Sequence, residues 1–304
     1  MPPQIVRRHG KGYPPLLREL HDPPERLYLR GDGEPDLLAR PAVAVVGARS
    51  CSAYGAQVAR DVSRKLAAAG AVVVSGLARG IDADAHRGAL EADGITVAVL
   101  GCGIDRDYPR ANADLANRIA RTGLIVSEYP PGVEPAPWRF PARNRIVAGL
   151  ALATVVVEAR ARSGALITAD FALELGREVF AVPGEITSSL SAGTNDLIRQ
   201  GATPLLAAED VLEALGLETA PARPEARLTQ AATAVLGAAR DGPGGADELA
   251  FAAGLDAALA AAALIELELA GLVVCTDGVY RCRDSAGRLV PLNQGRSPDA
   301  PTPA

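Results

Sequence analysis

Short apolar runs alternate with helical patterns through most of the chain. The intervals after the first two runs carry the 3.6-residue apolar spacing of helices, over 55–69 and 83–92. Nearly continuous Val, Leu and Ile runs are typical of strands buried on both faces of a parallel sheet. The predicted strands are AVAVVG at 42–47, AVVVSG at 71–76, TVAVLG at 96–101, LIVSEY at 124–129, TVVVEA at 154–159 and EVFAVPG at 178–184.

This alternation predicts an α/β fold over 41–217, with an extended Rossmann-like, doubly wound, mostly parallel sheet. Several strands end in glycine, serine or a charged residue, as at Gly47, Ser127 and Glu158. Ligands of open α/β sheets bind outside the carboxyl ends of the strands. We therefore expect the functional site at that edge of the sheet.

Residues 1–40 are rich in proline and charge. Two Pro-Pro pairs, Pro14-Pro15 and Pro23-Pro24, interrupt any long element. We expect this segment to be an N-terminal extension that packs on the domain, with the strands beginning only at Ala42.

The pattern changes beyond a polar, Pro-broken linker at 218–226. Three helices, over 228–239, 246–253 and 256–270, precede two apolar runs that flank Asp277-Gly278, a dipeptide typical of a tight hairpin. This predicts a small winged-helix domain over 227–283, followed by a disordered tail at 284–304. The third helix carries no Arg or Lys over 256–268, which favours contact with protein over reading of duplex DNA.

Composition narrows the class of protein. The chain has 304 residues with 48% hydrophobic content, and no apolar run approaches the ~20 residues needed to span a bilayer. We also find no secretory signal pattern, so we expect a cytoplasmic protein without a membrane partner. Cysteines without metal-ligand spacing predict no metal site and no disulfide framework; they are Cys51, Cys102, Cys275 and Cys282.

The net charge of −5 argues against a uniformly basic surface, so any nucleic-acid site must be local. Residues 139–162 hold such a site, because five arginines and one glutamate give a local charge of +4. Phe140 lies among these arginines, with Trp138 beside it. Single strands need cations along the backbone and ring faces for bases. The alternative is that both rings fill the core beneath an exposed helix start.

Three strand-to-helix turns can hold phosphates on backbone N–H groups. The first contains Gly47, Arg49 and Ser50, the second runs from Ser75 to Gly80, and the third contains Ser163-Gly164. None matches the GxGxxG or GxxxxGK[ST] signature, so no cofactor is expected. We expect Asp82 to cap the helix that follows the second turn.

Two titratable residues invite a catalytic interpretation. His86 has no paired Ser or Cys nearby in the pattern, which favours a structural role. Glu158 can act as a general base, but it is equally suited to pairing with Arg143 or Arg145, and we favour the pairing.

The motifs, taken in order, resemble the DNA processing protein A (DprA/Smf) family. The resemblance covers about 12–282, and it is carried by GARSCSAYG, VSGLARGIDADAHRGAL, VAVLGCGIDRDYP, SEYPPG, FPARNRIVAGL, VVVEARARSGALITADFALELGREVFAVPG and AGTNDLIRQGA. It implies a non-catalytic protein that binds and protects single-stranded DNA and helps to load the RecA recombinase, in natural transformation and in recombinational repair.

The resemblance also implies a set of DNA-binding residues. Arg49 and Phe140 are the leading members, and no residue is expected to be catalytic. The full set is Gly47, Arg49, Ser50, Ser75, Gly76, Ala78, Gly80, Ser127, Phe140, Arg143, Asn144, Arg145, Ser163 and Gly164.

The same resemblance implies partners. It predicts a homodimer formed near 196–200, contact with RecA from the same region, and single-strand-binding protein as a further partner. Relative to longer members, the chain lacks an N-terminal helical domain and presents arginines where they have pocket lysines, so affinity and partner contacts are expected to differ.

Two alternatives stay open. Similar folds hydrolyse nucleoside monophosphates with Glu and Arg beside a Gly-rich turn, and Glu158, Arg162 and Gly164 can be interpreted in that way. Those enzymes usually carry a GG-containing turn, which is absent here. The second alternative is a ligand sensor whose winged helix binds duplex DNA, against which the acidic third helix argues.

Overall fold

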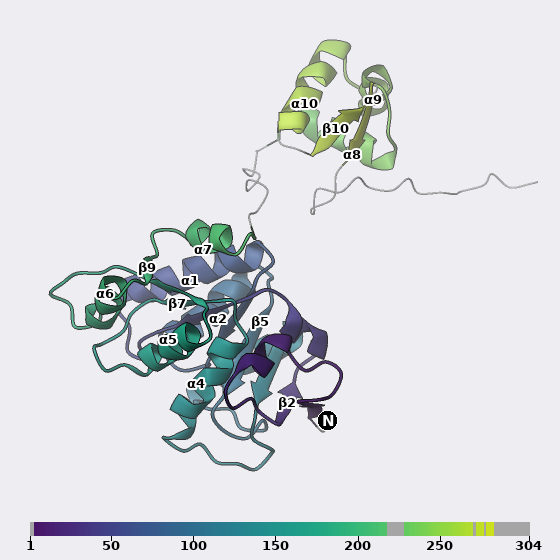
Figure 1. The fold of residues 1–304 in the computed structure, drawn as a ribbon. Coiled ribbons are helices and arrows are strands. Elements are labelled where there is room, and N and C mark those ends of the chain that lie inside the picture. Colours follow the sequence, from purple (N-terminus) through teal and green to yellow (C-terminus); the bar gives the residue numbers. More distant parts are fainter. Residues whose placement is uncertain (1–2, 218–227, 270–271, 277, 283–304) are drawn as a thin grey trace, which may run out of the picture. The chain divides into compact units, whose positions relative to one another are not determined.

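The computed structural model describes residues 3–217, 228–269, 272–276 and 278–282. These belong to two compact units, 1–219 and 220–304 (Figure 1). The expected linker at 218–226 and tail at 284–304 lie outside the described residues, as do residues 227 and 283 and Asp277 of the expected hairpin turn.

The first unit alternates strands and helices along the chain. Its strands are β1 (Gln4–Arg7), β2 (Arg26–Arg30), β3 (Ala42–Val46), β4 (Val72–Ser75), β5 (Thr96–Leu100), β6 (Leu124–Ser127), β7 (Ala153–Val156), β8 (Glu178–Ala181) and β9 (Thr203–Pro204). Its α-helices are α1 (Ala53–Ala68), α2 (Ile81–Glu91), α3 (Ala113–Thr122), α4 (Arg139–Gly149), α5 (Gly164–Glu174), α6 (Ala192–Arg199) and α7 (Ala208–Ala214). Short 3-10 helices are η1 (Pro15–Glu19), η2 (Pro35–Ala39) and η3 (Arg110–Asn112).

All nine strands join one sheet in the order β1-β2-β6-β5-β4-β3-β7-β8-β9. In this spatial order, every neighbouring pair from β6 to β9 is parallel. The β1–β2 and β2–β6 pairs are antiparallel. The prediction of a mostly parallel α/β sheet is therefore confirmed. The strand order reverses between β3 and β7, which is the place where open α/β sheets form a binding crevice.

The N-terminal segment departs from expectation because it contributes strands. β1 pairs with β2, and β2 pairs with β6 through Tyr28 and Ser127. The expectation that strands begin only at Ala42 was wrong. Pairs of prolines exclude long elements, but they leave room for strands of four and five residues at the antiparallel edge of a sheet.

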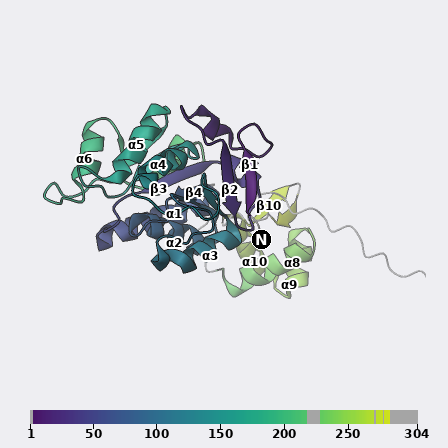
Figure 2. The same ribbon diagram turned by 90° about the horizontal axis from the view of Figure 1, so that it is seen from below.

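Three apolar clusters cover the faces of the sheet, and two of them contain residues of β3. Side chains that alternate along β3 separate between them: Ala44 packs in one cluster with α4 and α5, and Val43 packs in the other with α1, α2 and α7. Figure 2 shows α1, α2 and α3 on one side of the strands and α4 and α5 on the other. β3 is buried at every position, which explains its unbroken apolar run.

The second unit is small and mostly helical. It contains α8 (Gln230–Asp241), α9 (Ala246–Ala253) and α10 (Ala257–Leu269), with β10 (Val273–Thr276) paired antiparallel to β11 (Val279–Cys282). Its own core includes Val235, Leu249 and Leu264, one from each helix. The predicted winged-helix order of three helices and a two-stranded pair is present.

Membrane-spanning length is not reached by any single helix among the described residues. One pair of helices, Ala246–Ala253 and Ala257–Glu268, reaches the length and apolar composition of a membrane span when taken together. The pair is bent by 107° at the break between its helices.

Candidate functional site

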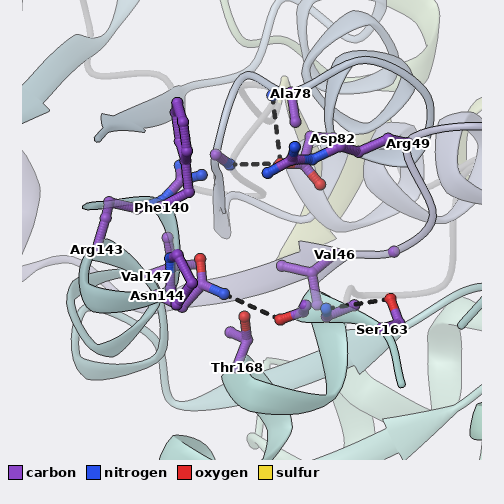
Figure 3. A pocket seen from close by; sticks show the side chains of 15 residues that line it. Val46, Arg49, Ala78, Asp82, Phe140, Arg143, Asn144, Val147, Ser163 and Thr168 are labelled. Carbon is purple, nitrogen blue, oxygen red and sulfur yellow. Dashed lines mark hydrogen bonds between the residues drawn. The ribbon is translucent and has the colours of Figure 1, made fainter. Parts of the chain in front are cut away.

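A cavity of about 390 Å³ opens at the carboxyl edge of the sheet, beside the reversal between β3 and β7. The turns after β3 and β4 form one side, and α4 and the start of α5 form the other (Figure 3). Its lining residues are Val46, Gly47, Arg49, Gly76, Ala78, Asp82, Phe140, Pro141, Arg143, Asn144, Val147, Ser163, Gly164, Ala165 and Thr168. We call this space the first cavity.

A second cavity of about 590 Å³ adjoins it. Arg49, Gly76, Ala78, Phe140 and Arg143 line both spaces and therefore form their common wall. The remaining lining residues of the second cavity are Ser50, Arg79, Tyr108, Pro109, Arg110 and Ala111.

An exposed cation, Arg49, lies beside a half-buried ring, Phe140, in the common wall. The Cζ of Arg49 lies 5.4 Å from the centroid of the Phe140 ring, within range of a cation–π contact. A side chain at Gly101 would place its Cβ 2.9 Å from the ring, so this glycine is needed for the ring to lie there. Trp138, in contrast, is 62% exposed, which rules out its filling the core.

Arg143 is a buried cation in the same wall. Its side chain is 4% exposed, and its Nη1 donates to the carbonyl of Val99. A Cβ at Gly76 would overlap the guanidinium, so Gly76 makes room for it. Burial lowers the pKa of Arg143 and the nearby Asp82 carboxylate raises it, but a guanidinium stays charged in proteins.

Asp82 does not cap α2 as expected. The cap position is Gly80, whose φ of 73° favours glycine, and the Asp82 carboxylate turns back toward the loop. Its Oδ2 accepts from the backbone N–H groups of Gly76 at 3.2 Å and Ala78 at 3.3 Å. Burial raises the pKa of Asp82, while Arg143 acts in the opposite direction. The second turn is thus held by an internal carboxylate.

The first turn is also closed by an internal carboxylate. Glu158 accepts from the Ser52 backbone N–H at 2.9 Å and from the Ser52 hydroxyl, at the N-terminus of α1. A Cβ at Gly55 would overlap that carboxylate. The expected pairing of Glu158 with Arg143 or Arg145 was wrong. An exogenous phosphate cannot accept from the Ser52 N–H and hydroxyl while the carboxylate of Glu158, which is 5% exposed, is bound to them.

The N-terminus of α5 faces the first cavity without such a carboxylate among the described residues. Ser163 caps the helix through its side chain, which accepts from the Ala165 N–H at 3.3 Å. Asn144 on α4 donates to the carbonyl of Gly164 at 3.0 Å and fixes the distance between the two helices. A Cβ at Gly164 would meet no atom within 4 Å, so the helix start is open. This geometry suits an anion.

Four residues of the expected set lie away from both cavities. The Ser75 hydroxyl donates to Val45, and the Ser127 hydroxyl donates to Cys102, each inside the sheet. Gly80 supplies the turn into α2 but does not line either space. Arg145 pairs with Glu128 at 2.6 Å and donates from Nε to the carbonyl of Asp22 at 3.1 Å. The other expected residues line one or both cavities; they are Gly47, Arg49, Ser50, Gly76, Ala78, Phe140, Arg143, Asn144, Ser163 and Gly164.

The sequence analysis missed Tyr108 and Arg110, and it included Arg79 only as part of the Ser75–Gly80 turn. Tyr108 stacks on Phe140 with ring centroids 5.3 Å apart and an interplanar angle of 27°. Arg79 lies in the loop after β4, Tyr108 lies in the longer loop after β5, and Arg110 begins η3 at the end of that loop. An aromatic residue and cations at that edge are a readable signal, because the carboxyl ends of parallel strands converge.

His86 lies buried behind the site, which supports the structural role expected for it. Its Nδ1 is 2.7 Å from the Thr96 hydroxyl, which itself donates to the Val73 carbonyl. The hydroxyl has only one proton, so Nδ1 must donate and Nε2 carries the lone pair. Burial, with Arg143 and Arg87 nearby, lowers the pKa of His86 to about 3.

Metal chemistry has no support in the part of the chain that the structure describes, where no three His, Cys, Asp or Glu side chains gather as ligands. The four cysteines are free thiols, and Cys102 and Cys282 are buried. Burial raises the pKa of Cys102 to about 11, so this thiol stays protonated.

Comparisons with known proteins agree on one family. The family model of DNA recombination-mediator protein A matches residues 4–216, and that of the DprA winged helix domain matches 218–278. Protein Smf of Escherichia coli is 41% identical over 287 residues, which are 91% of this chain and 76% of that protein.

Two solved structures share the fold at moderate identity. DNA processing protein A of Streptococcus pneumoniae is 45% identical with a TM-score of 0.66, over 69% of this chain and 73% of its own. DNA processing protein A of Helicobacter pylori, whose structure is described for its single-stranded DNA binding mode, is 33% identical with a TM-score of 0.63, over 70% of this chain and 95% of its own. The chain belongs to the DNA recombination-mediator protein A family, which includes the proteins named DprA and Smf.

Proposed function

We propose that this chain binds single-stranded DNA in the first cavity. The observation that carries the proposal is the combination of an exposed guanidinium, an aromatic ring and an open helix start around one hollow. Arg49, Phe140 and the α5 N-terminus come from three separate parts of the chain and meet there. A cation, a ring face and backbone N–H groups are what a phosphate and an unpaired base require.

The phosphate site of this proposal is the start of α5. In the other two turns, the carboxylates of Glu158 and Asp82 already accept from the N–H groups of Ser52, Gly76 and Ala78. At the Ser163-Gly164 turn, the Gly164 N–H has no hydrogen-bond partner among the described residues, and it lies at the positive end of an 11-residue helix. In this proposal Arg49, on the opposite side of the cavity, contacts the same stretch of the DNA backbone.

Preference for single strands follows from the shape of the site. A duplex presents its bases as edges within grooves, whereas a cavity of about 390 Å³ takes a base that has left its stack. α10 of the second unit carries no Arg or Lys to place in a major groove. The single-stranded DNA binding mode described for the Helicobacter pylori relative supports this proposal.

The proposed role is binding without a chemical step. Glu158, the residue that a nucleotide hydrolase would use as a base, is buried and holds both the backbone N–H and the hydroxyl of Ser52. It is therefore unavailable to activate a water. Release of free base from nucleotides by the purified protein would contradict this part of the proposal.

In the cell we propose that the bound strand is protected and delivered to the RecA recombinase, in transformation and in recombinational repair. The description of the family as a recombination mediator supports this role. We further propose a homodimer formed near α6, where Ile186, on the segment that leads into the helix, is 95% exposed. An apolar side chain exposed to this extent is consistent with an interface.

The binding proposal is tested by fluorescence anisotropy with matched single- and double-stranded oligonucleotides over a salt series. Single strands should bind more tightly, and Arg49→Ala should weaken binding about tenfold and reduce the salt slope by about one unit. Arg118→Ala is the control, because it removes the same charge from an exposed position on α3 away from both cavities. Equal loss in both variants, or no binding by the wild type, would overturn the proposal.

A further inference from the structure

Three exposed arginines surround the second cavity. They are Arg49 in the loop after β3, Arg79 in the loop after β4, and Arg110 at the start of η3. No ion pair engages them among the residues that the structure describes. Neighbouring arginines are different, because Arg30 pairs with Asp107 and Arg106 pairs with Glu134, each at 2.7 Å. The second cavity therefore has a cluster of unneutralised positive charge.

The acids of the loop after β5 do not compensate this charge. Asp107 binds Arg30, and Asp105 accepts from the backbone N–H of Gly132 at 2.9 Å. Both carboxylates thus have partners other than Arg110. An anion entering the second cavity meets cations whose local counter-charges are already engaged.

A buried cation also contributes to the common wall. Arg143 lines both cavities at 4% exposure, and its Nε has no hydrogen-bond partner among the described residues. Buried donors are nearly always paired in native proteins. The common wall therefore supplies positive potential to both spaces from beneath.

Two stacked rings, Phe140 of the common wall and Tyr108 beside it, connect one cavity to the other. Phe140 lines both spaces, while Tyr108 lines only the second and stacks on Phe140. Tyr108 is 44% exposed, so the aromatic pair ends in an accessible ring on the side of the second cavity. Successive bases of a single strand stack on such ring faces with little sequence preference.

We propose that the second cavity is a further nucleotide subsite for the same strand, in which Tyr108 stacks the base and Arg79 and Arg110 bind the phosphate that follows it. The inference rests on the proposed function, because the strand must first occupy the first cavity. It assigns contacts to three residues that the binding proposal does not need, and it fixes the course of the strand from α5 across Phe140 toward the loop after β5.

The first test measures affinity against oligonucleotide length. Wild type should gain affinity from about three to about twelve thymidines as the second subsite fills. Arg79→Ala and Arg110→Ala should each lower the affinity for the longer strand about fivefold. The affinity for the shorter strand should stay within about twofold of wild type. Arg118→Ala again serves as the charge-matched control. Equal losses at both lengths, or no loss, would overturn the second subsite.

The second test separates stacking from folding. 2-Aminopurine placed at successive positions of the longer strand should show one position whose fluorescence depends on Tyr108. Tyr108→Ala should remove that signal and weaken binding about tenfold, whereas Tyr108→Phe should keep both, because the ring remains. Loss of the signal in both variants, or its persistence in both, would contradict stacking on this ring.

The two proposals fail in different ways. If wild type binds no single strand of any length, the proposed function fails and the second subsite fails with it. If wild type binds and Arg49→Ala weakens both lengths, but the variants of the second cavity behave like Arg118→Ala, only the second subsite fails.

Discussion

At the scale of single residues, the site depends on which charges are already satisfied. Glu158 and Asp82 occupy two of the three turns that the sequence offers to an anion, while Arg49 and the start of α5 stay open. Sequence alone showed that all three turns are rich in small residues at helix starts. It could not show which carboxylate folds back onto which turn, because Glu158 reaches Ser52 across 106 positions.

The fit of Gly76 against Arg143 gives the first prediction. Gly76→Ala should lower the free energy of unfolding by about 3 kcal/mol and abolish binding, because a Cβ overlaps the buried guanidinium. Urea unfolding and anisotropy measure the two effects. Adding Arg143→Ala removes the overlap. The double variant should therefore lose less unfolding free energy than the sum of the losses in the two single variants. Simple additivity would show that the two residues do not conflict.

The buried His86 gives a pH prediction. Its pKa of about 3 lies below the ordinary 6.5, so the unfolded chain takes up the proton first as pH falls. The stability contributed by His86 is fully present above pH 6.5. It should fall by about 1.4 kcal/mol per pH unit below that value, until His86 itself protonates near pH 3.

The check is urea unfolding of wild type and His86→Gln between pH 7.5 and 4.5. The difference in unfolding free energy between the two proteins should shrink as pH falls, because the variant lacks this proton. Asp82, whose pKa is raised by burial, acts in the opposite direction and is common to both proteins. A difference that does not change with pH would rule out the buried neutral imidazole.

At the scale of elements, the parallel strands were readable because each is buried on both faces, as β3 and β5 are at every position. β1 and β2 were not, because they are short and lie at an antiparallel edge between prolines. α4 illustrates a mixed outcome. Its arginines were recognised as a basic cluster, yet one faces the cavity wall and another, Arg145, joins the helix to β6 and the N-terminal segment.

Arg145 therefore carries a prediction about how the elements hold together. Arg145→Ala should cost about 2 kcal/mol of stability, because the carboxylate of Glu128, whose side chain is only 14% exposed, then loses its partner. Affinity for single strands should stay within about twofold of wild type, since the side chain lines neither cavity. Replacing Glu128 as well, with Ala, should restore part of the stability. A large loss of affinity at unchanged stability would show that Arg145 takes part in binding.

At the scale of the whole molecule, the chain divides into two units with separate cores. The change from alternating runs to three helices and a hairpin predicted the second unit from sequence. Its surface includes Phe251 at 90% exposure and Ile265 at 58%, which suits contact with another protein. The spacing of apolar residues does not predict which partners a unit contacts, because it reports only burial within the chain.

Self-association is the prediction at this scale. Ile186→Glu should convert the proposed homodimer to a monomer, because a charge replaces an apolar side chain at the interface. Light scattering after size exclusion measures the mass. Leu206→Glu, at a residue that is 81% exposed on the segment before α7, is the matched control and should leave the dimer intact. A wild type that is monomeric at high concentration would exclude the dimer.

The carboxylate of Glu158 at the start of α1 has a consequence for selectivity. In a sheet of this type, the turn after the first parallel strand is the seat that a mononucleotide or dinucleotide would claim. In this chain the carboxylate of Glu158 occupies that position. Because it is part of the chain, its local concentration is independent of the concentration of free nucleotides. A free nucleotide that approaches this turn must displace a tethered carboxylate, so the turn after β3 disfavours the nucleotide-binding mode that is typical of such sheets.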